Sequence, residues 1–184
     1  MTNLKAFVVS AMLVATLATT SPAHAKNEKT WATISDIGLY GLTAVAIATP
    51  IIKQDKQGAF QAAGSIAAAQ LVTIGLKESF PERRPDGSDR KSFPSGHTSQ
   101  SFAAAATLFT RQGATVGIPA FAIASLVGVA RVQADKHFYY DVIVGAAIGT
   151  ASGLLLTRQR PNRSVAFVPW GDSKGGGLSF AMRF

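Results

Sequence analysis

The chain has 184 residues, no cysteine, 47% hydrophobic residues and a formal net charge of +8. This length suits one domain with a sizeable core, and the lack of cysteine excludes disulfides and thiolate metal sites while leaving the compartment open. The basic residues lie in short connections between apolar segments, with few aromatic residues among them, which argues against nucleic-acid binding and favours an anionic membrane surface or a phosphorylated substrate.

The first 25 residues have the pattern of a secretory signal peptide. Lys5 precedes an apolar run from Ala6 to about Leu17, and Ala23-His24-Ala25 has the small-x-small form of a cleavage site. The alternative is a retained membrane anchor that begins at the same residues, although the run is short for a spanning helix. Both readings predict export.

Residues 26–163 are predicted to form one all-α domain, a bundle of about five helices. Gly145, Gly149 and Gly153 recur every fourth residue and should line one helix face, where small residues let helix backbones approach closely. The five alanine-rich apolar stretches that define the helices are Ile34–Ile52, Phe60–Leu76, Thr98–Thr110, Val116–Val132 and Val142–Thr157.

The connections between these stretches alternate in character. Three are short and net basic (53–56, 111–113 and 158–160), whereas 77–97 and 131–141 are longer and carry the polar motifs. If the stretches span a membrane, all the motifs lie on one face, and the positive-inside rule places the basic turns in the cytoplasm and the motifs outside. The alternative is a soluble periplasmic bundle, because the stretches are only moderately apolar and Thr98–Thr110 is short for a span.

The last 21 residues, 164–184, change period. Ser164–Trp170 and Leu178–Phe184 alternate apolar and polar residues on either side of a glycine-rich segment, Gly171–Gly177. This pattern predicts a β-hairpin, and one hairpin cannot close a barrel, so we expect a small flap on the bundle.

His137 and Asp141 are the first pair with a chemical interpretation. Four residues apart on the expected opening turn of the last helix, they would lie on one face within reach of each other. A carboxylate on one imidazole nitrogen fixes the tautomer and leaves the other nitrogen nucleophilic. The plainer reading is a carboxylate at a helix N-terminus beside an incidental histidine.

Pro94-Ser95-Gly96-His97 precedes the third stretch. Ser95 is a suitable helix N-cap, Gly96 allows close approach of an anion to the backbone, and amides at a helix start bind phosphate well. His97 would then project from the first turn, in position to protonate a leaving oxygen. Alone, the motif is also consistent with an ordinary loop-to-helix turn.

Lys77, Arg84 and Arg131 supply three cations near these histidines. A phosphoryl group in transfer carries charge on three equatorial oxygens, for which guanidinium and ammonium groups are suitable partners. Basic residues at helix ends also anchor to lipid headgroups, and this solvated role is expected for Arg83, Arg90, Lys91 and Lys136.

Together, Lys77-x6-Arg84-Pro85, Pro94-Ser95-Gly96-His97 and Arg131-x5-His137-x3-Asp141 resemble the three-part signature of the type-2 phosphatidic acid phosphatase superfamily. That superfamily also includes bacterial class A acid phosphatases and vanadium haloperoxidases. The resemblance covers about Ile34 to Thr157, with order and spacing intact. One departure is Ala130, where the family often has serine before the motif arginine.

The resemblance implies a role for each motif residue. His137 would attack phosphorus and form a phosphohistidine, Asp141 would orient it, and His97 would protonate the leaving alcohol and then activate water. The phosphate oxygens would be held by Lys77, Arg84, Arg131, Ser95 and Gly96. No metal or other cofactor is expected, since acidic residues are not clustered as a two-metal site requires.

The predicted function is therefore hydrolysis of lipid phosphates at the periplasmic face of the inner membrane. Candidate substrates are phosphatidate, phosphatidylglycerol phosphate, isoprenyl pyrophosphate and a lipid A phosphate. The alternatives are a soluble broad-specificity acid phosphatase, a vanadate-dependent haloperoxidase, and a non-catalytic protein that binds anionic headgroups. The last has no need of His97 or of His137 with Asp141, and no protein partner is predicted.

Overall fold

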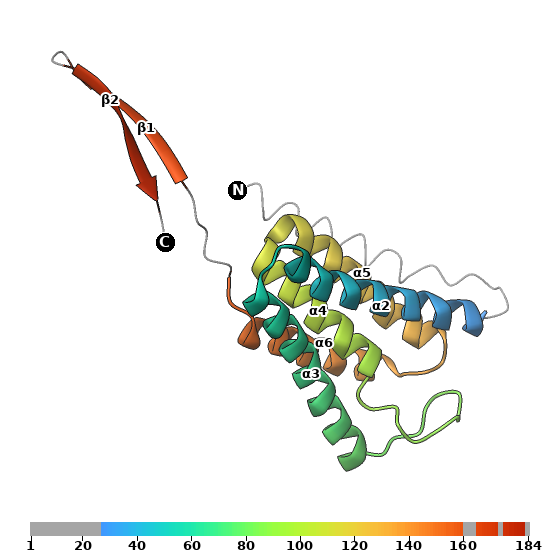
Figure 1. Cartoon of the computed structure of the whole chain (residues 1–184). Coiled ribbons are helices and arrows are strands. Elements are labelled where there is room, and N and C mark those ends of the chain that lie inside the picture. Colours follow the sequence, from blue (N-terminus) through green and yellow to red (C-terminus); the bar gives the residue numbers. More distant parts are fainter. Residues whose placement is uncertain (1–26, 160–164, 173–174, 183–184) are drawn as a thin grey trace.

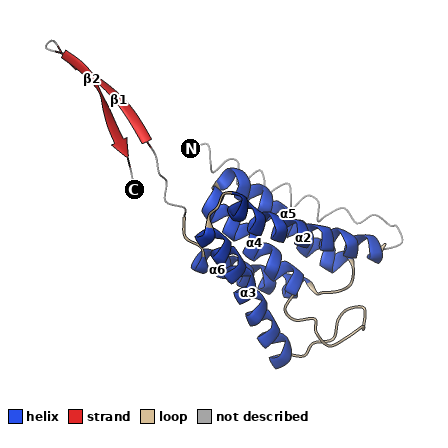
Figure 2. Cartoon of the chain, viewed as in Figure 1, coloured by secondary structure: helices blue, strands red, loops and turns tan. Residues whose placement is uncertain are grey.

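A computed structural model describes residues 27–159 and the backbone of residues 165–172 and 175–182. Residues 27–159 form an all-helical bundle (Figure 2). The predicted signal peptide lies outside the described residues. The five helices are α2 (Glu28–Ile52), α3 (Lys56–Ser79), α4 (Gly96–Gln112), α5 (Ala114–Gln133) and α6 (Tyr139–Leu156).

The five-helix prediction is confirmed, and the helices differ from the predicted stretches mainly at their ends. The prediction followed the apolar residues, whereas three of the helices begin at polar caps: Asn27, Asp55 and Ser95 each accept a backbone N–H of the first turn. Helix α2 therefore begins six residues earlier than expected, at Glu28 instead of Ile34.

Two strands follow the bundle, β1 (Val165–Asp172) and β2 (Gly175–Met182), paired antiparallel. Their bounds differ from the predicted Ser164–Trp170 and Leu178–Phe184. The side chains of this segment and residues 160–164 lie outside the described part of the chain. The terminal flap and the division at residue 164 therefore remain predictions.

Helix α4 is the centre of the bundle. The other four helices surround it in the order α2, α3, α6, α5, and each of them contacts it (Figure 1). The four residues Ala103–Ala106 are fully buried, so every side of α4 faces protein along this turn. This position explains why its sequence is rich in small residues and less apolar than the others.

Helix α6 approaches α4 most closely, through the glycine face predicted from sequence. A Cβ added at Gly145 would lie 2.6 Å from the carbonyl oxygen of Ser95, and one at Gly153 would lie 2.9 Å from that of Ala103. One at Gly149 would collide with the carbonyl oxygen of Ser99. The three glycines thus bring the two backbones together over two turns.

The connections gather at two ends of the bundle, as their alternation predicted. At one end Arg111 pairs with Asp55 and donates to the backbone of Arg158, and Lys53 donates to Gln112 at 2.7 Å. At the other end lie the α3–α4 and α5–α6 connections, which carry the motifs (Figure 1).

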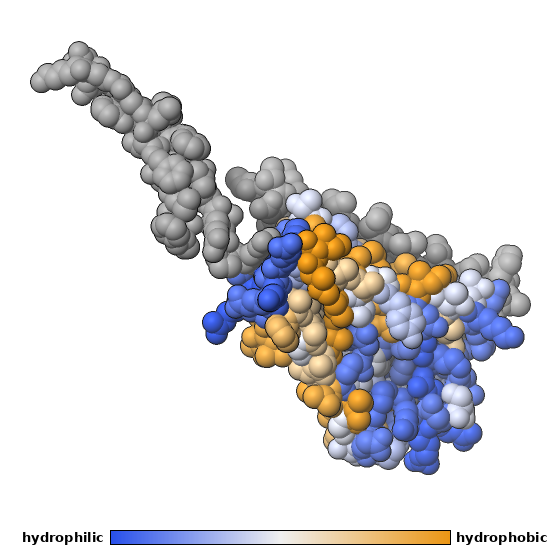
Figure 3. All heavy atoms as spheres, in the orientation of Figure 1, coloured by the Kyte–Doolittle hydropathy of each residue, from blue (hydrophilic) through white to orange (hydrophobic). Residues whose placement is uncertain are grey.

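Four of the helices (α2, α3, α5 and α6) are long and apolar enough to cross a membrane. Large apolar side chains point outward from them, including Ile52, Phe60 and Leu155, each about four-fifths exposed (79%, 80% and 81%). Figure 3 shows an apolar band between two hydrophilic ends. This distribution is the reverse of what water favours and is typical of a bundle surrounded by lipid.

The polar residues that lower the apolarity of these stretches are paired inside the bundle. Gln70 donates to Gln100 at 2.9 Å, and Gln100 donates to Thr43 at 3.1 Å. Gln61 accepts from Arg111 at 2.6 Å. Such contacts between helices satisfy polar groups away from lipid, so moderate apolarity does not by itself indicate a soluble protein.

The close contact between α4 and α6 gives a stability prediction. Gly149→Ala should destabilise the bundle by about 1–3 kcal/mol, because its methyl group meets the α4 backbone, which cannot rotate away. Thermal unfolding in detergent measures the effect. Gly64→Ala is the matched control, since a Cβ there meets nothing within 4 Å and should raise stability by up to about 1 kcal/mol. Equal melting temperatures for the two variants would contradict the packing described.

Candidate active site

The α3–α4 connection is fixed to the end of α3 by Lys77. Its ammonium group donates to the carbonyl oxygens of Lys91, Ser92 and Pro94 at 2.6, 3.2 and 2.6 Å. The sequence predicted that Lys77 binds phosphate, with a lipid headgroup as the alternative partner. In the structure it also holds the segment that leads into Ser95 and His97.

Arg84 lies directly beside His137. Its Nη1 is 3.5 Å from Nε2 of His137 and donates to the carbonyl oxygen of Lys136 at 3.2 Å. Its Nε donates to Asp89 at 2.7 Å, which fixes the plane of the guanidinium. Arg84 therefore presents a cation at the imidazole nitrogen that faces away from Asp141.

The prediction that His137 sits on the first turn of α6 is wrong. Helix α6 begins at Tyr139, and His137 precedes it in the α5–α6 connection. Asp141 is the third helical residue, and its Oδ2 accepts the N–H of Phe138 at 2.9 Å and the hydroxyl of Ser92 at 2.5 Å. The carboxylate thus caps its own helix, which excludes His137 from the helical turn.

His137 and Asp141 are nevertheless neighbours in a fully shielded site. Nδ1 of His137 lies 3.5 Å from Oδ2 of Asp141, with side-chain exposures of 2% and 0%. This separation is long for an N–H···O bond, and both Nδ1 and Oδ1 of Asp141 are buried without a hydrogen-bond partner in the described part of the chain. The 3.5 Å separation is to Oδ2, which already accepts from Ser92 and Phe138, so a small side-chain rotation is needed for Nδ1 to donate to the carboxylate.

His97 projects from the first turn of α4, as predicted. Ser95 is the N-cap and accepts from the backbone N–H of Thr98 at 3.4 Å. The N–H of Ser95 donates to the carbonyl oxygen of Asp141 at 3.0 Å, so that amide is occupied. The amides of Gly96 and His97 follow it in the first turn, where N–H groups have no intrahelical partner.

Arg131 is a buried cation, with 7% of the residue exposed. The Nη1 of Arg131 donates to the hydroxyl of Ser35 at 3.4 Å, and the Nε of Arg131 has no hydrogen-bond partner among the residues described. A buried guanidinium without a bound carboxylate is costly unless an anion joins it. Arg131 is therefore a suitable phosphate ligand.

The four cations expected to be solvated do not behave alike. Arg83, Arg90 and Lys91 are exposed, and Lys91 forms a 3.5 Å ion pair with Glu78. Lys136 is half-buried and pairs with Asp86 beside Arg84. It thus helps to hold the connection that carries His137.

Three polar residues near the motifs were missed by sequence reasoning: Ser35, Asp36 and Ser92. Ser92 donates to Asp141, Ser35 contacts Arg131, and Oδ1 of Asp36 lies 2.8 Å from Nε2 of His97. An acidic residue inside an apolar helix is an available sign of function, and Asp36 gives it. Nothing comparable distinguishes the two serines.

The surroundings of His137 act on its protonation. Burial lowers the pKa of this imidazole to about 4, with Arg131, Arg84 and Lys77 lowering it further and Asp141 opposing them. The ring is therefore neutral at physiological pH, as a nucleophile must be. In the part of the chain that the structure describes, no group of three or more acidic or histidine side chains could hold a metal ion.

Comparison with known proteins places these residues in a family. Residues 58–164 match the PAP2 superfamily. The chain is 35% identical over 97 residues to a lipid A 1-phosphatase of Porphyromonas gingivalis, covering 51% of this chain and 22% of that protein. It is 30% identical over 120 residues to a lipid A 4'-phosphatase of Helicobacter pylori, covering 56% of this chain and 61% of that protein.

The fold is similar to the crystal structure of Aquifex aeolicus LpxE, with a TM-score of 0.62 and 24% sequence identity. That match covers 72% of this chain and 86% of the other. The chain thus spans about a fifth and three-fifths of the two curated relatives, and most of the solved one.

The environment of His137 predicts an unusual titration. In histidine NMR spectra of the detergent-solubilised protein, its ring should change protonation with a midpoint of about 4, against the ordinary value of 6.5. It should stay neutral as the pH falls from 7 to about 5. His137→Gln assigns the signal by removing it. A midpoint near 6.5 would contradict the shielded, cation-flanked position.

Proposed function

Because the chain belongs to the PAP2 superfamily, we propose that it is a metal-independent phosphatase that acts on membrane lipid phosphates through a phosphohistidine intermediate. The observation that carries the proposal is the contact of Arg84 with Nε2 of His137 at 3.5 Å, with Asp141 on the opposite side of the ring. A nucleophilic nitrogen and a phosphate-binding cation thus face the same space.

In the first step Nε2 of His137 attacks phosphorus while the bond to the leaving oxygen breaks. Asp141, on the Nδ1 side, holds the tautomer that leaves the Nε2 lone pair free and supports the positive charge that forms on the ring. His97 gives a proton to the leaving oxygen. In the second step His97 takes a proton from water, whose oxygen attacks phosphorus as the nitrogen–phosphorus bond breaks.

The cations stabilise the charge on the transferring phosphoryl group. Arg131 brings a buried guanidinium whose Nε has no partner among the described residues, and Arg84 brings one whose plane is fixed by Asp89. In a low-dielectric site such preorganised charges act strongly on developing negative charge. Lys77 adds the positive charge of its ammonium group, which is held beside the motif segment by the carbonyl oxygens that it binds.

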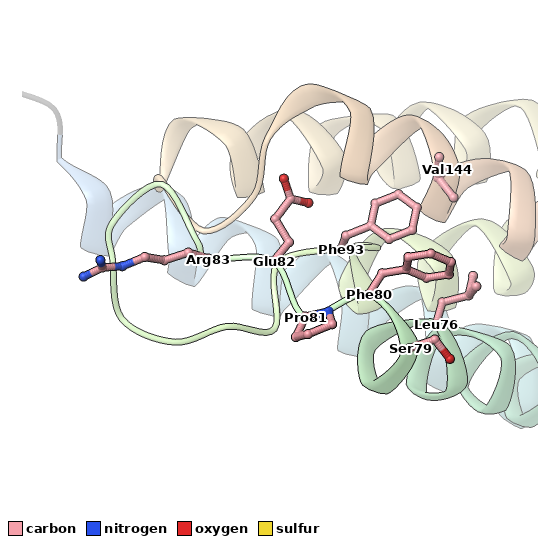
Figure 4. A pocket seen from close by; sticks show the side chains of 8 residues that line it. All are labelled: Leu76, Ser79, Phe80, Pro81, Glu82, Arg83, Phe93 and Val144. Carbon is pink, nitrogen blue, oxygen red and sulfur yellow. The ribbon is translucent and has the colours of Figure 1, made fainter.

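A lipid substrate is favoured by the surface of the bundle. Four helices are apolar enough to cross a membrane, and the site lies at one end of them. An apolar groove of about 910 Å³ adjoins the motif segment (Figure 4). It is lined by Leu76, Ser79, Phe80, Pro81, Glu82, Arg83, Phe93 and Val144.

We assign this groove to an acyl chain of the substrate. Leu76 directly precedes Lys77, and Phe93 directly precedes the Pro94-Ser95-Gly96-His97 motif. The rings of Phe80 and Phe93 meet edge to face, 6.2 Å apart, and form the apolar wall (Figure 4). A chain lying there would keep its phosphate near the motif segment.

Among lipid phosphates, a glycolipid phosphate such as that of lipid A is the first candidate, since two relatives are lipid A phosphatases. Phosphatidate, phosphatidylglycerol phosphate and isoprenyl pyrophosphate are the others. The basic turns at 53–56, 111–113 and 158–160 would face the cytoplasm and the site would face the periplasm.

Phosphate release in EDTA, from a panel of lipid phosphates and soluble monoesters, tests this proposal. We expect turnover that favours lipids in detergent or vesicles. His137→Ala should lower it more than about a thousandfold while the protein stays folded, because the nucleophile is lost. Retained rates in the folded variant would contradict the phosphohistidine route.

Other outcomes of this panel would favour the alternatives. Faster turnover of soluble esters would indicate a broad-specificity acid phosphatase, and activity lost in EDTA would indicate a metal. Lipid binding without hydrolysis would indicate a headgroup-binding protein. Bromide oxidation that requires added vanadate and peroxide would indicate a haloperoxidase.

The groove gives a separate prediction. Phe80→Ala should lower kcat/KM for a lipid phosphate by about threefold to tenfold through KM, because apolar contact with the chain is lost. A soluble monoester should be unaffected. Phe60→Ala is the matched control, an exposed phenylalanine at the opposite end of α3. Equal effects of the two variants on the lipid would contradict the assignment.

A further inference from the structure

Helix α2 lies outside the part of the chain that matches the family, which begins at residue 58. It nevertheless contributes two adjacent side chains to the site. The hydroxyl of Ser35 accepts from Arg131 at 3.4 Å, and the carboxylate of Asp36 meets Nε2 of His97 at 2.8 Å. Helix α2 therefore adds two side chains to the set of site residues, although it carries none of the three motifs.

The contact between Asp36 and His97 has the geometry of a strong hydrogen bond. At 2.8 Å, an imidazole N–H on Nε2 donates to a carboxylate oxygen, and such charge-assisted bonds are the stronger ones. A proton fixed on Nε2 leaves Nδ1 as the nitrogen that exchanges protons. The partner thus selects which nitrogen of His97 does the acid–base work.

The pair is also partly open, with side-chain exposures of 29% for His97 and 49% for Asp36. An acid that protonates a leaving group and then accepts a proton from water needs such access. Burial lowers the pKa of His97, the positive charges of Arg131 and Arg84 lower it further, and Asp36 opposes them. Without Asp36, two cations would face the ring unopposed by this carboxylate.

We propose that Asp36 is a positioning residue for the reaction: it holds His97 through Nε2, so that Nδ1 donates a proton to the leaving oxygen. The proton moves from Nδ1 to that oxygen as its bond to phosphorus breaks and His137 bonds to phosphorus. In hydrolysis of the phosphohistidine, Nδ1 takes a proton from the attacking water. This inference rests on the proposed function.

The dependence of the rate on the leaving group tests it. An alkyl or lipid phosphate needs a proton on its leaving oxygen, whereas p-nitrophenol leaves readily as an anion and needs little help from an acid. In Asp36→Asn, kcat/KM for an alkyl phosphate should fall on the order of 100-fold, against about threefold for p-nitrophenyl phosphate. Asp36→Glu should recover part of the loss, because it restores the carboxylate.

Two further variants complete the design. His97→Ala should show the same leaving-group pattern, and adding Asp36→Asn to it should cost nothing further, since the two residues act as a unit. Glu28→Gln is the matched control, a carboxylate-to-amide change in the exposed first turn of the same helix. It should match the wild type on both substrates.

The failures are distinguishable. Wild-type protein that hydrolyses neither substrate would overturn the proposed function itself. If the wild type is active, equal losses of kcat/KM in Asp36→Asn on both esters would indicate general damage to the site and would contradict the positioning role. So would an unchanged rate on both, or an additive loss in the double variant.

Discussion

The close approach of α6 to α4 is the contact on which the site depends. Gly145, in the second turn of α6, lets α6 approach the carbonyl oxygen of Ser95 at the start of α4, and the N–H of Ser95 donates to the carbonyl oxygen of Asp141. The N-cap of one helix is thus bonded to the first turn of the other. His97 and Asp141 come from segments that are far apart in the chain, and this backbone contact holds their helices in one register.

The two histidines of the candidate site each lie beside a carboxylate, but in different surroundings. His137 and Asp141 are shielded, at 2% and 0% side-chain exposure, whereas His97 and Asp36 are partly open at 29% and 49%. A nucleophile benefits from burial, which keeps the imidazole neutral. An acid–base group must exchange protons with a leaving group and with water, so access is required. The two environments therefore suit the roles in the proposed mechanism, in which His137 is the nucleophile and His97 is the acid–base group.

Much of the fold could be predicted from the sequence because the helices are long apolar stretches separated by polar connections. Their starts were less predictable, because α2 and α3 begin at the polar caps Asn27 and Asp55, ahead of the apolar residues. The position of His137 could not, since its spacing to Asp141 fits a helical turn equally well. The capping bond that the N–H of Phe138 donates to the carboxylate of Asp141 marks the later start of α6. The partnership of Asp36 with His97 joins residues 61 apart, and no local pattern predicts which polar groups from distant segments will meet. The carbonyl partners of Lys77 could not be predicted from the sequence for the same reason.

The placement of polar groups ties the chemistry to the membrane. The amides of Gln70 and Gln100 and the hydroxyls of Thr73 and Ser99 pair with one another inside the bundle, so its outer surface is left to apolar side chains. Such a surface confines the site to one polar end of an apolar band. A lipid anchored in the same bilayer carries its phosphate at the boundary between apolar and polar layers, which is where the motif segments lie. Under the proposed function, a lipid phosphate would reach the cations without leaving its own layer, whereas a soluble ester would gain nothing from this arrangement.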